Sequence, residues 1–218
     1  MKLEDLRDRF LAAQLEGDRR EGLRLVMEEG LAAGRSVPEL HLQVIQAAQH
    51  QIGEMWERNE ISVAREHVAS SLAQLALAQL YPHLPRTQAN GFKAVVACVQ
   101  GEYHNLAARM ASDFLEIAGF EVVFMGADVP PEEIFSMMEE TKAPVLALSM
   151  TVSLHFEALR ATVDALRKAR GNEVMVMVGG RAAEENEAAI KDLGVSCVGT
   201  DARKMVEEAL TVLRRKAS

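Results

Sequence analysis

The fold is decided by one stretch, Lys93-Ala94-Val95-Val96-Ala97-Cys98-Val99, which runs directly into Gln100-Gly101-Glu102-Tyr103-His104-Asn105-Leu106-Ala107. The first part is apolar and rich in valine, which is typical of a strand buried on both faces. The second part is a polar loop that precedes a helical pattern. A histidine that leaves the carboxyl end of the first strand of an α/β sheet points into the crevice where such sheets bind ligands. His104 is therefore a candidate ligand residue.

The alternation of apolar and amphipathic segments continues to the end of the chain. The predicted strands are Lys93–Val99, Glu121–Met125, Val145–Met150, Glu173–Val178 and Val195–Val198. The predicted helices are Asn105–Ala118, Pro131–Thr141, Phe156–Arg170, Ala183–Leu193 and Ala202–Lys216. Apolar strands joined by helices predict an α/β fold with a parallel sheet of flavodoxin-like order, 2-1-3-4-5, covered on both faces.

The amino-terminal part has a different period. Residues 1–84 show only helical periodicity, with breaks at Gly17, Gly34 and Asn59 and with Ser62 as the N-cap of a fourth helix. Four helices with short connections predict an antiparallel bundle. Prolines and polar residues follow and mark a domain boundary. We expect a helical cap over residues 1–84, a linker over 85–91 and an α/β domain over 92–218.

Composition narrows the possible partners. The chain has 218 residues and a net charge of −8, which argues against a nucleic-acid surface. No apolar run is long enough to span a bilayer, and the first residues lack the apolar core of a signal peptide. Cys98 and Cys197 fall in predicted strands and are expected to be buried free thiols, which suits a reducing compartment. We therefore expect a cytoplasmic protein that binds neither nucleic acid nor membrane.

In the predicted topology, the loops after the first, third and fourth strands meet at one edge of the sheet. These loops are Gly101–Ala107, Ser149–Ser153 and Gly179–Arg181. The chain has neither nucleotide-binding glycine motif, nor the acidic cluster of a phosphoaccepting domain, nor a flavodoxin-type phosphate loop. Imidazole is a strong ligand for transition metals, and a carboxylate such as Glu102 orients it and raises its basicity. A histidine, small hydroxyls and glycines together suit a metallo-macrocycle with a long tail.

At this point the chain resembles cobalamin-binding proteins that combine a helical cap with a flavodoxin-like domain. Their loop reads Asp-x-His-x-x-Gly, and here it is Glu102-x-His104-x-x-Ala107. Their hydroxyl and glycine motifs resemble Ser149 with Ser153 and Gly179-Gly180. The resemblance implies adenosylcobalamin or methylcobalamin as cofactor, with His104 binding cobalt and the cofactor tail inserted into the domain. The implied contacts of this domain are Glu102, His104, Asn105, Leu106, Ala107, Ser149, Thr151, Val152, Ser153, Gly179, Gly180, Gly199 and Thr200.

In the cap, Trp56 is followed after nine residues by Glu66-His67, which resembles the CarH-type cobalamin photoreceptors. The resemblance implies that these three side chains contact the upper ligand of cobalt. Glu57 stands where those photoreceptors that form a bis-histidine adduct have histidine, and the MerR-type DNA-binding domain is not expected before the cap. Ala107 in place of glycine costs affinity only if its φ is positive or its packing very close.

Three functions are consistent with these residues. The leading hypothesis is a cobalamin-binding sensor or regulatory protein, responsive to light, that signals through a partner protein or through self-association, and the other two are alternatives to it. The second is a corrinoid methyl carrier that serves separate methyltransferases. The third is an adaptor that no longer holds cobalamin, for which Ala107 is the only support.

Overall fold

The computed structural model describes residues 2–217, with side chains through residue 215. The chain divides into two compact units, residues 1–85 and residues 86–218. Each unit has its own buried core, so each is described by itself.

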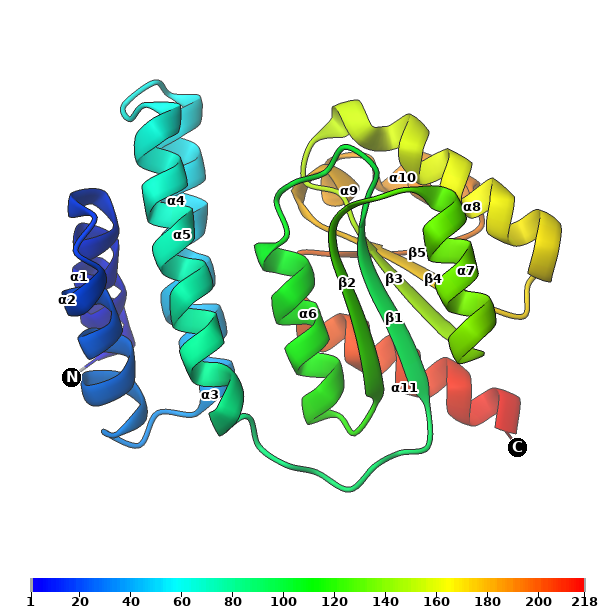
Figure 1. Ribbon diagram of the computed structural model, residues 1–218, viewed down its shortest axis with the longest axis horizontal. Coiled ribbons are helices and arrows are strands. Elements are labelled where there is room, and N and C mark those ends of the chain that lie inside the picture. Colours follow the sequence, from blue (N-terminus) through cyan, green and yellow to red (C-terminus); the bar gives the residue numbers. More distant parts are fainter. Residues whose placement is uncertain (1, 218) are drawn as a thin grey trace. The chain divides into compact units, whose positions relative to one another are not determined.

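The first unit contains the four expected helical segments (Figure 1). In chain order its elements are α1 (Leu3–Glu16), α2 (Arg19–Arg24), the π-helical η1 (Leu25–Leu31), α3 (Val37–Glu39), the π-helical η2 (Leu40–Gln46), α4 (Ala47–Glu57), α5 (Val63–Leu80) and the short 3-10 turn η3 (Tyr81–His83). The second and third helical segments thus each pass through a π-helical stretch. The sequence pattern did not predict these stretches.

The ends of the helices follow local chemistry. Gly17 adopts a left-handed conformation, with φ of 76°, and closes α1. The Ser62 hydroxyl accepts a hydrogen bond from the Arg65 amide at the start of α5, as expected for an N-cap. Gly30 lets two segments approach closely, because a Cβ there would lie 2.8 Å from Leu40 Cδ2. These positions fix the turns of the bundle.

The second unit is the expected five-stranded parallel sheet, in the order β2-β1-β3-β4-β5. The strands are β1 (Lys93–Val99), β2 (Glu121–Val129), β3 (Val145–Ser149), β4 (Met175–Gly179) and β5 (Ser196–Gly199). The helices are α6 (Leu106–Ile117), α7 (Pro131–Thr141), the 3-10 turn η4 (Ser153–His155), α8 (Phe156–Arg170), α9 (Arg181–Glu185), α10 (Glu187–Asp192) and α11 (Ala202–Ala217). The order predicted from the sequence is therefore confirmed.

Helices cover both faces of the sheet (Figure 1). Residues of α6 and α11, among them Leu115 and Met205, pack against alternate side chains of the central strands. Residues of α7, α8 and α9 to α10, among them Ile134 and Leu159, pack on the opposite face. Burial on both faces explains why the strands read as continuous apolar runs rather than as alternating patterns.

Two details of this unit differ from the predictions. Strand β2 continues to Val129, through an irregular region with positive φ at Gly126 and Asp128. The predicted helix 183–193 is two short helices that meet at Asn186, whose amide donates to Ala182 O and to Ser153 Oγ.

Both cysteines are buried free thiols, as expected. Among the described residues, no helix is long and apolar enough to cross a membrane.

Candidate functional site

The carboxyl ends of the strands bring small residues to one level of the sheet. Cys98 pairs in register with Ser149, Ser149 with Gly179, and Gly179 with Gly199. The loops that follow these residues therefore begin side by side, as the topology predicted. The predicted histidine, hydroxyl and glycine loops share one edge of the sheet.

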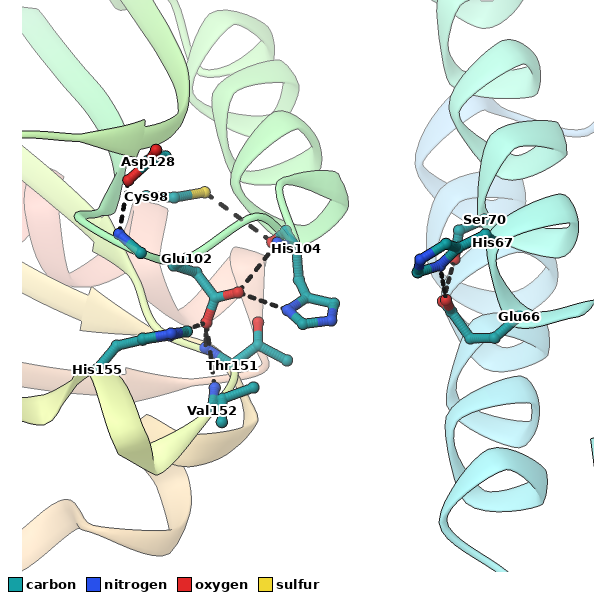
Figure 2. A network of polar contacts seen from close by, with 11 residues as sticks. Glu66, His67, Ser70, Cys98, Glu102, His104, Asp128, Thr151, Val152 and His155 are labelled. Carbon is teal, nitrogen blue, oxygen red and sulfur yellow. Dashed lines mark hydrogen bonds and ion pairs between the residues drawn. The ribbon is translucent and has the colours of Figure 1, made fainter. Parts of the chain in front are cut away.

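The side chain of Glu102 connects the loops at this edge of the sheet (Figure 2). Its side chain is fully buried, yet five N–H groups surround its carboxylate. Oε1 lies 3.0 Å from the His104 amide and 2.5 Å from His104 Nδ1. Oε2 lies 2.7 Å from the Thr151 amide, 3.1 Å from the Val152 amide and 3.1 Å from His155 Nδ1. One carboxylate thus ties the loop after β1 to the loop after β3.

The surroundings of Glu102 keep it ionised. Burial by itself raises the pKa of this carboxyl, but hydrogen bonds from the side chain and backbone of His104 and from the Thr151 amide outweigh it. The resulting pKa is about 2. An ionised carboxylate only accepts hydrogen bonds, so both neighbouring imidazoles must carry hydrogen on Nδ1.

The His104 ring is held by Glu102 and is more than half exposed. Its Nδ1 donates to Glu102, and Nε2 lies on the far side of the ring (Figure 2). The side chain is 54% exposed. Because the Nδ1–H tautomer leaves the lone pair of a neutral imidazole on Nε2, this arrangement suits a metal ligand backed by a carboxylate.

Asp128 fixes the same loop from the end of β2. Its Oδ1 accepts from the Gly101 amide at 2.7 Å, and its Oδ2 accepts from the Tyr103 hydroxyl at 2.8 Å. The Asp128 amide in turn donates to Glu102 O at 2.9 Å. The hydrogen bonds from Gly101 and Tyr103 lower the pKa of Asp128. Asp128 was not a predicted site residue, because it lies beyond the predicted end of its strand.

His155 is a second residue of this site that the sequence did not predict. It ends the short 3-10 turn η4, and its side chain is mostly buried against the Glu102 carboxylate. The sequence offered one signal for it, since His155 lies two residues after Ser153, the end of the predicted hydroxyl motif. Only the folded loop reveals that it shares the carboxylate of Glu102 with His104.

Ser149 is buried, and among the described residues its hydroxyl has no hydrogen-bond partner other than the weak Cys98 thiol. The Cys98 thiol beside it is a weak hydrogen-bonding group, and burial raises the pKa of that thiol to about 12. A buried hydroxyl left in this state is a natural partner for a ligand atom. Ser149 therefore fits the predicted pocket for a polar tail.

Close approach of neighbouring loops explains why Gly179 and Gly180 are glycines. A Cβ on Gly180 would lie 2.4 Å from Met150 O, and φ there is 105°. A Cβ on Gly179 would lie 3.0 Å from Gly199 O. Both glycines thus allow the loops after β3, β4 and β5 to pass close together. They also leave the level of Ser149 without bulky side chains.

The remaining predicted residues of this unit lie around the same edge. Asn105 precedes α6, and Leu106 and Ala107 form its first turn. Ala107 is exposed and helical, so the cost of a positive φ does not arise. Ser153 accepts from Asn186, while Thr200 donates to Glu184 at 3.4 Å after β5.

The predicted cap residues lie near the turn that joins α4 to α5. Trp56 is 45% exposed and His67 is 73% exposed, so neither is a core residue of the bundle. Glu66 Oε2 lies 2.6 Å from His67 Nδ1, and Glu66 Oε1 accepts from the Ser70 hydroxyl (Figure 2). The first unit therefore presents an aromatic ring and an oriented imidazole to its surroundings.

Comparison with known families identifies the ligand class. Residues 92–210 match the B12 binding domain family, and residues 6–81 match a second family of the same description. The chain belongs to the B12 binding domain family. Its cofactor is cobalamin, a corrinoid that contains cobalt. The oriented imidazole, the weakly bonded Ser149 hydroxyl and the row of small residues fit a B12 binding domain.

The relatives of this B12-binding chain include corrinoid proteins and a transcriptional repressor. A dimethylamine corrinoid protein from Methanosarcina acetivorans is 26% identical over 190 residues, which cover 86% of this chain and 82% of that protein. The HTH-type transcriptional repressor CarH from Myxococcus xanthus is 29% identical over 172 residues, which cover 78% of this chain and 56% of that protein. The predicted resemblance to CarH is thus present, and corrinoid proteins match over more of their own length.

A solved structure shares the fold of this B12-binding chain. The monomethylamine corrinoid protein of Methanosarcina barkeri aligns with a TM-score of 0.87 at 20% identity, over 97% of this chain and 100% of that one. At this identity the likeness shows the fold alone. It confirms the helical region followed by a five-stranded parallel sheet.

Proposed function

We propose that this protein is a corrinoid methyl carrier that serves a separate methyltransferase. The observation that carries the proposal is the buried Glu102 carboxylate, which holds His104 Nδ1 at 2.5 Å, beside a histidine side chain that is 54% exposed. When bound, cobalamin supplies a cobalt atom that accepts and releases a methyl group. His104 is the proposed lower ligand of that cobalt.

The chain's own residues have distinct parts in this proposal. Glu102 fixes the tautomer and orientation of His104 and raises its basicity as a ligand. Asp128 holds the loop that carries Glu102 and His104 in place, because it accepts hydrogen bonds from Gly101 and Tyr103. Ser149 binds the polar tail of the cofactor, and the glycines beside it leave room for that tail. The contacts proposed for Asn105, Leu106, Ala107, Thr151, Val152, Ser153, Gly199 and Thr200 line the same edge.

The names of relatives support a carrier more than a sensor. Dimethylamine corrinoid proteins align over most of their length, whereas CarH aligns over about half of its own. A carrier must hand its cargo to other proteins, so we expect a methyltransferase as partner. The first unit is proposed as a cap, with Trp56, Glu66 and His67 contacting the upper ligand of cobalt.

A light-responsive sensor is the second candidate. The exposed Trp56 and the Glu66–His67 pair favour it, because exposed side chains on a helical turn can report the loss of an upper ligand. In that case output passes through a partner protein or through self-association. Glu57 remains the residue that argues against a bis-histidine adduct, since carboxylates are poorer ligands than imidazole for such a metal.

The visible spectrum of the protein loaded with methylcobalamin in the dark tests the binding mode. The proposal predicts a base-off, His-on spectrum that disappears in His104→Ala. Retention of cobalamin with its own base still on cobalt, in the native chain, would contradict the proposed role of His104. Failure to retain cobalamin at all would favour an adaptor.

Illumination then separates the two candidates. A carrier loaded with adenosylcobalamin keeps the same mass by light scattering before and after light, whereas a sensor changes its assembly. Transfer of a labelled methyl group to a thiol, from the protein loaded instead with labelled methylcobalamin and in the presence of a co-purifying methyltransferase, is expected of the carrier. A change of assembly with no such transfer would replace the carrier by the sensor.

A further inference from the structure

We propose that the Tyr103 hydroxyl and the Asp128 carboxylate form a latch that positions the loop carrying His104. The inference rests on the proposed role of His104 as the cobalt ligand. It adds a positioning residue, Tyr103, which lies between Glu102 and His104 and to which none of the motifs assigns a role. Tyr103 acts through the loop and does not itself touch the metal.

The latch begins with an irregularity in the edge strand β2. From Ala97 to Val99, strand β1 advances by two residues. The paired stretch of β2, from Gly126 to Val129, advances by three. The extra residue makes a β-bulge, and bulges beside functional sites redirect a side chain. Asp128 lies inside this bulge.

The backbone of Asp128 is left-handed, with φ of 53°. Residues other than glycine rarely adopt this conformation, although aspartate tolerates it better than most. Backbone strain of this kind persists where the surrounding structure over-determines it, and it is concentrated at functional sites. The conformation of Asp128 therefore points to a role for its contacts.

Asp128 contacts each of the three residues that directly precede His104. Its Oδ1 accepts from the Gly101 amide at 2.7 Å, and its Oδ2 accepts from the Tyr103 hydroxyl at 2.8 Å. Its own amide donates to the Glu102 carbonyl oxygen at 2.9 Å. Three consecutive residues that are bound to one residue of another strand cannot shift independently, so the position of His104 is set relative to β2.

The other neighbour of β1 holds the same loop. Strand β1 lies between β2 and β3 in the sheet. After β3, the amides of Thr151 and Val152 donate to Glu102 Oε2, and Figure 2 shows Asp128 on the opposite side of the loop. The ligand loop is therefore anchored towards both neighbouring strands. Release on the β2 side would let it turn about the anchor on the β3 side.

The exposure of Tyr103 indicates that its hydroxyl, rather than its ring, carries the role. The residue is 68% exposed, so the ring contributes little to a core. The hydroxyl nevertheless bonds to Asp128. Tyr103→Phe removes this bond and leaves the ring in place, so it isolates the latch.

Two measurements on the full chain test Tyr103→Phe. Loss of one hydrogen bond typically costs about 2–10-fold in an equilibrium constant. We expect a loss of about that size in methylcobalamin affinity, measured by dark titration and the visible spectrum. In the protein without cofactor, the His104 amide is bonded to Glu102 Oε1, and its hydrogen exchange should become faster by about 2–10-fold. The amides of β1 should exchange at their native rates.

Other outcomes for Tyr103→Phe would overturn the inference. Native affinity would show that the latch does not position the cobalt ligand. Faster exchange of the β1 amides, together with a lower melting temperature, would show that Tyr103 supports the fold in general. Unchanged exchange of the His104 amide rejects the latch whether or not His104 binds cobalt. If that exchange is faster but the native chain lacks the His-on spectrum, only the proposed function fails.

Asp128→Gly tests the partner of the hydroxyl. Glycine accepts the left-handed conformation without strain, and both side-chain acceptors are lost. We expect a greater loss of methylcobalamin affinity than in Tyr103→Phe. Adding Tyr103→Phe to Asp128→Gly should cause no further loss, because the partner is already absent. The same loss from Tyr103→Phe in both backgrounds would show that the hydroxyl acts elsewhere, which would overturn the latch.

Tyr81→Phe is the matched control. It makes the same chemical change at the other tyrosine of the chain, which lies in the first unit and is 46% exposed. Methylcobalamin affinity and exchange of the His104 amide should both keep their native values. An effect equal to that of Tyr103→Phe would overturn the inference, because loss of either hydroxyl would then be sufficient.

Discussion

The protein contains two glutamate–histidine pairs with nearly the same contact and very different surroundings. Glu102 and His104 meet at 2.5 Å between Oε1 and Nδ1, and Glu66 and His67 meet at 2.6 Å between Oε2 and Nδ1. The carboxylate of Glu102 is fully buried among donors from two loops. The carboxylate of Glu66 is partly exposed and takes its other hydrogen bond from Ser70, one turn along the same helix.

This difference shows how a fold turns a common pair of residues into a fixed ligand. In the pair on the helix, Ser70 restrains the Glu66 carboxylate, but the His67 side chain is 73% exposed and can leave the pair by side-chain motion. The pair at the sheet edge is restrained by backbone amides that belong to separate strands, and its carboxylate has a pKa of about 2. We therefore expect the first unit to contribute an adaptable imidazole and the second a rigid one.

The largest expected effect is that of His104→Ala. Methylcobalamin affinity should fall by more than the roughly 100-fold upper limit typical of second partners, because the ligand itself is lost. Dark titration of the protein with methylcobalamin, followed by the visible spectrum, measures this loss. His67→Ala is the matched change in the other pair. An equal loss of methylcobalamin affinity in His67→Ala would contradict the assignment of His104 as the cobalt ligand.

Glu102→Gln should have the next largest effect, with methylcobalamin affinity lower by about 10–100-fold. It should also change the response to acid. The pKa of Glu102 is lowered in the folded chain from its ordinary value of 4.5 to about 2. Its ionised form therefore stabilises the fold above about pH 4.5, and this stabilisation is lost as the pH falls towards 2.

The acid response gives a measurable difference between the two pairs. At about 1.36 kcal/mol for each pKa unit, Glu102 contributes on the order of 3 kcal/mol at neutral pH. Urea unfolding of the sheet, followed by amide exchange between pH 2 and 7, should show this contribution in the native chain and not in Glu102→Gln. Glu66→Gln should leave the profile of the sheet unchanged. A profile for Glu102→Gln that parallels the native one would show that the buried charge does not stabilise the sheet.

Ser149→Ala should have a moderate effect confined to the loaded protein. The only hydrogen-bonding neighbour of the hydroxyl among the described residues is the weak Cys98 thiol, so its removal should leave the melting temperature of the apo-protein nearly unchanged. One lost hydrogen bond to the cofactor tail is worth about 0.5–1.5 kcal/mol, or roughly 2–10-fold in affinity. A lower melting temperature of the apo-protein, with native affinity, would mean that the hydroxyl supports the fold instead.

His67→Ala should have the smallest effect. Its side chain is 73% exposed, and exposed substitutions usually change stability by less than about 0.5 kcal/mol. We expect methylcobalamin affinity within about 2-fold of the native value, because a methyl group as upper ligand offers His67 only dispersion contacts of about 0.1–0.2 kcal/mol for each atom pair. A change of assembly on illumination that is present in the native chain and lost in His67→Ala would instead support the sensor.

The sequence was sufficient for the architecture because the signals there are local. Apolar runs such as Lys93–Val99 and caps such as Ser62 mark the elements, and parallel strands leave few possible orders. The Glu102–His104 pair was visible for the same reason, since its two residues lie two positions apart. The break at Asn186 was missed because its amide bonds to Ser153, which is remote in sequence.

The missing parts of the site are those built from distant segments. His155 and Asp128 reach the Glu102 loop from two other strands, and no spacing in the sequence reports such contacts. The effect of Ala107 depended on backbone conformation, and the helical start of α6 decides it. From the sequence, a light-responsive sensor ranked above a methyl carrier, whereas the relatives favour the carrier. The residues alone could not decide, because a carrier and a sensor place the same residues around cobalt.

The most direct test of the account is the electron paramagnetic resonance spectrum of the protein that contains ¹⁵N-labelled histidine and is loaded with unlabelled cob(II)alamin. A nitrogen bound below cobalt splits each cobalt line, into two when it is ¹⁵N and into three when it is ¹⁴N. We expect doublets in the labelled native chain and their loss in His104→Ala. Triplets in the labelled native chain would mean that the cofactor keeps its own base on cobalt, which contradicts the role of His104.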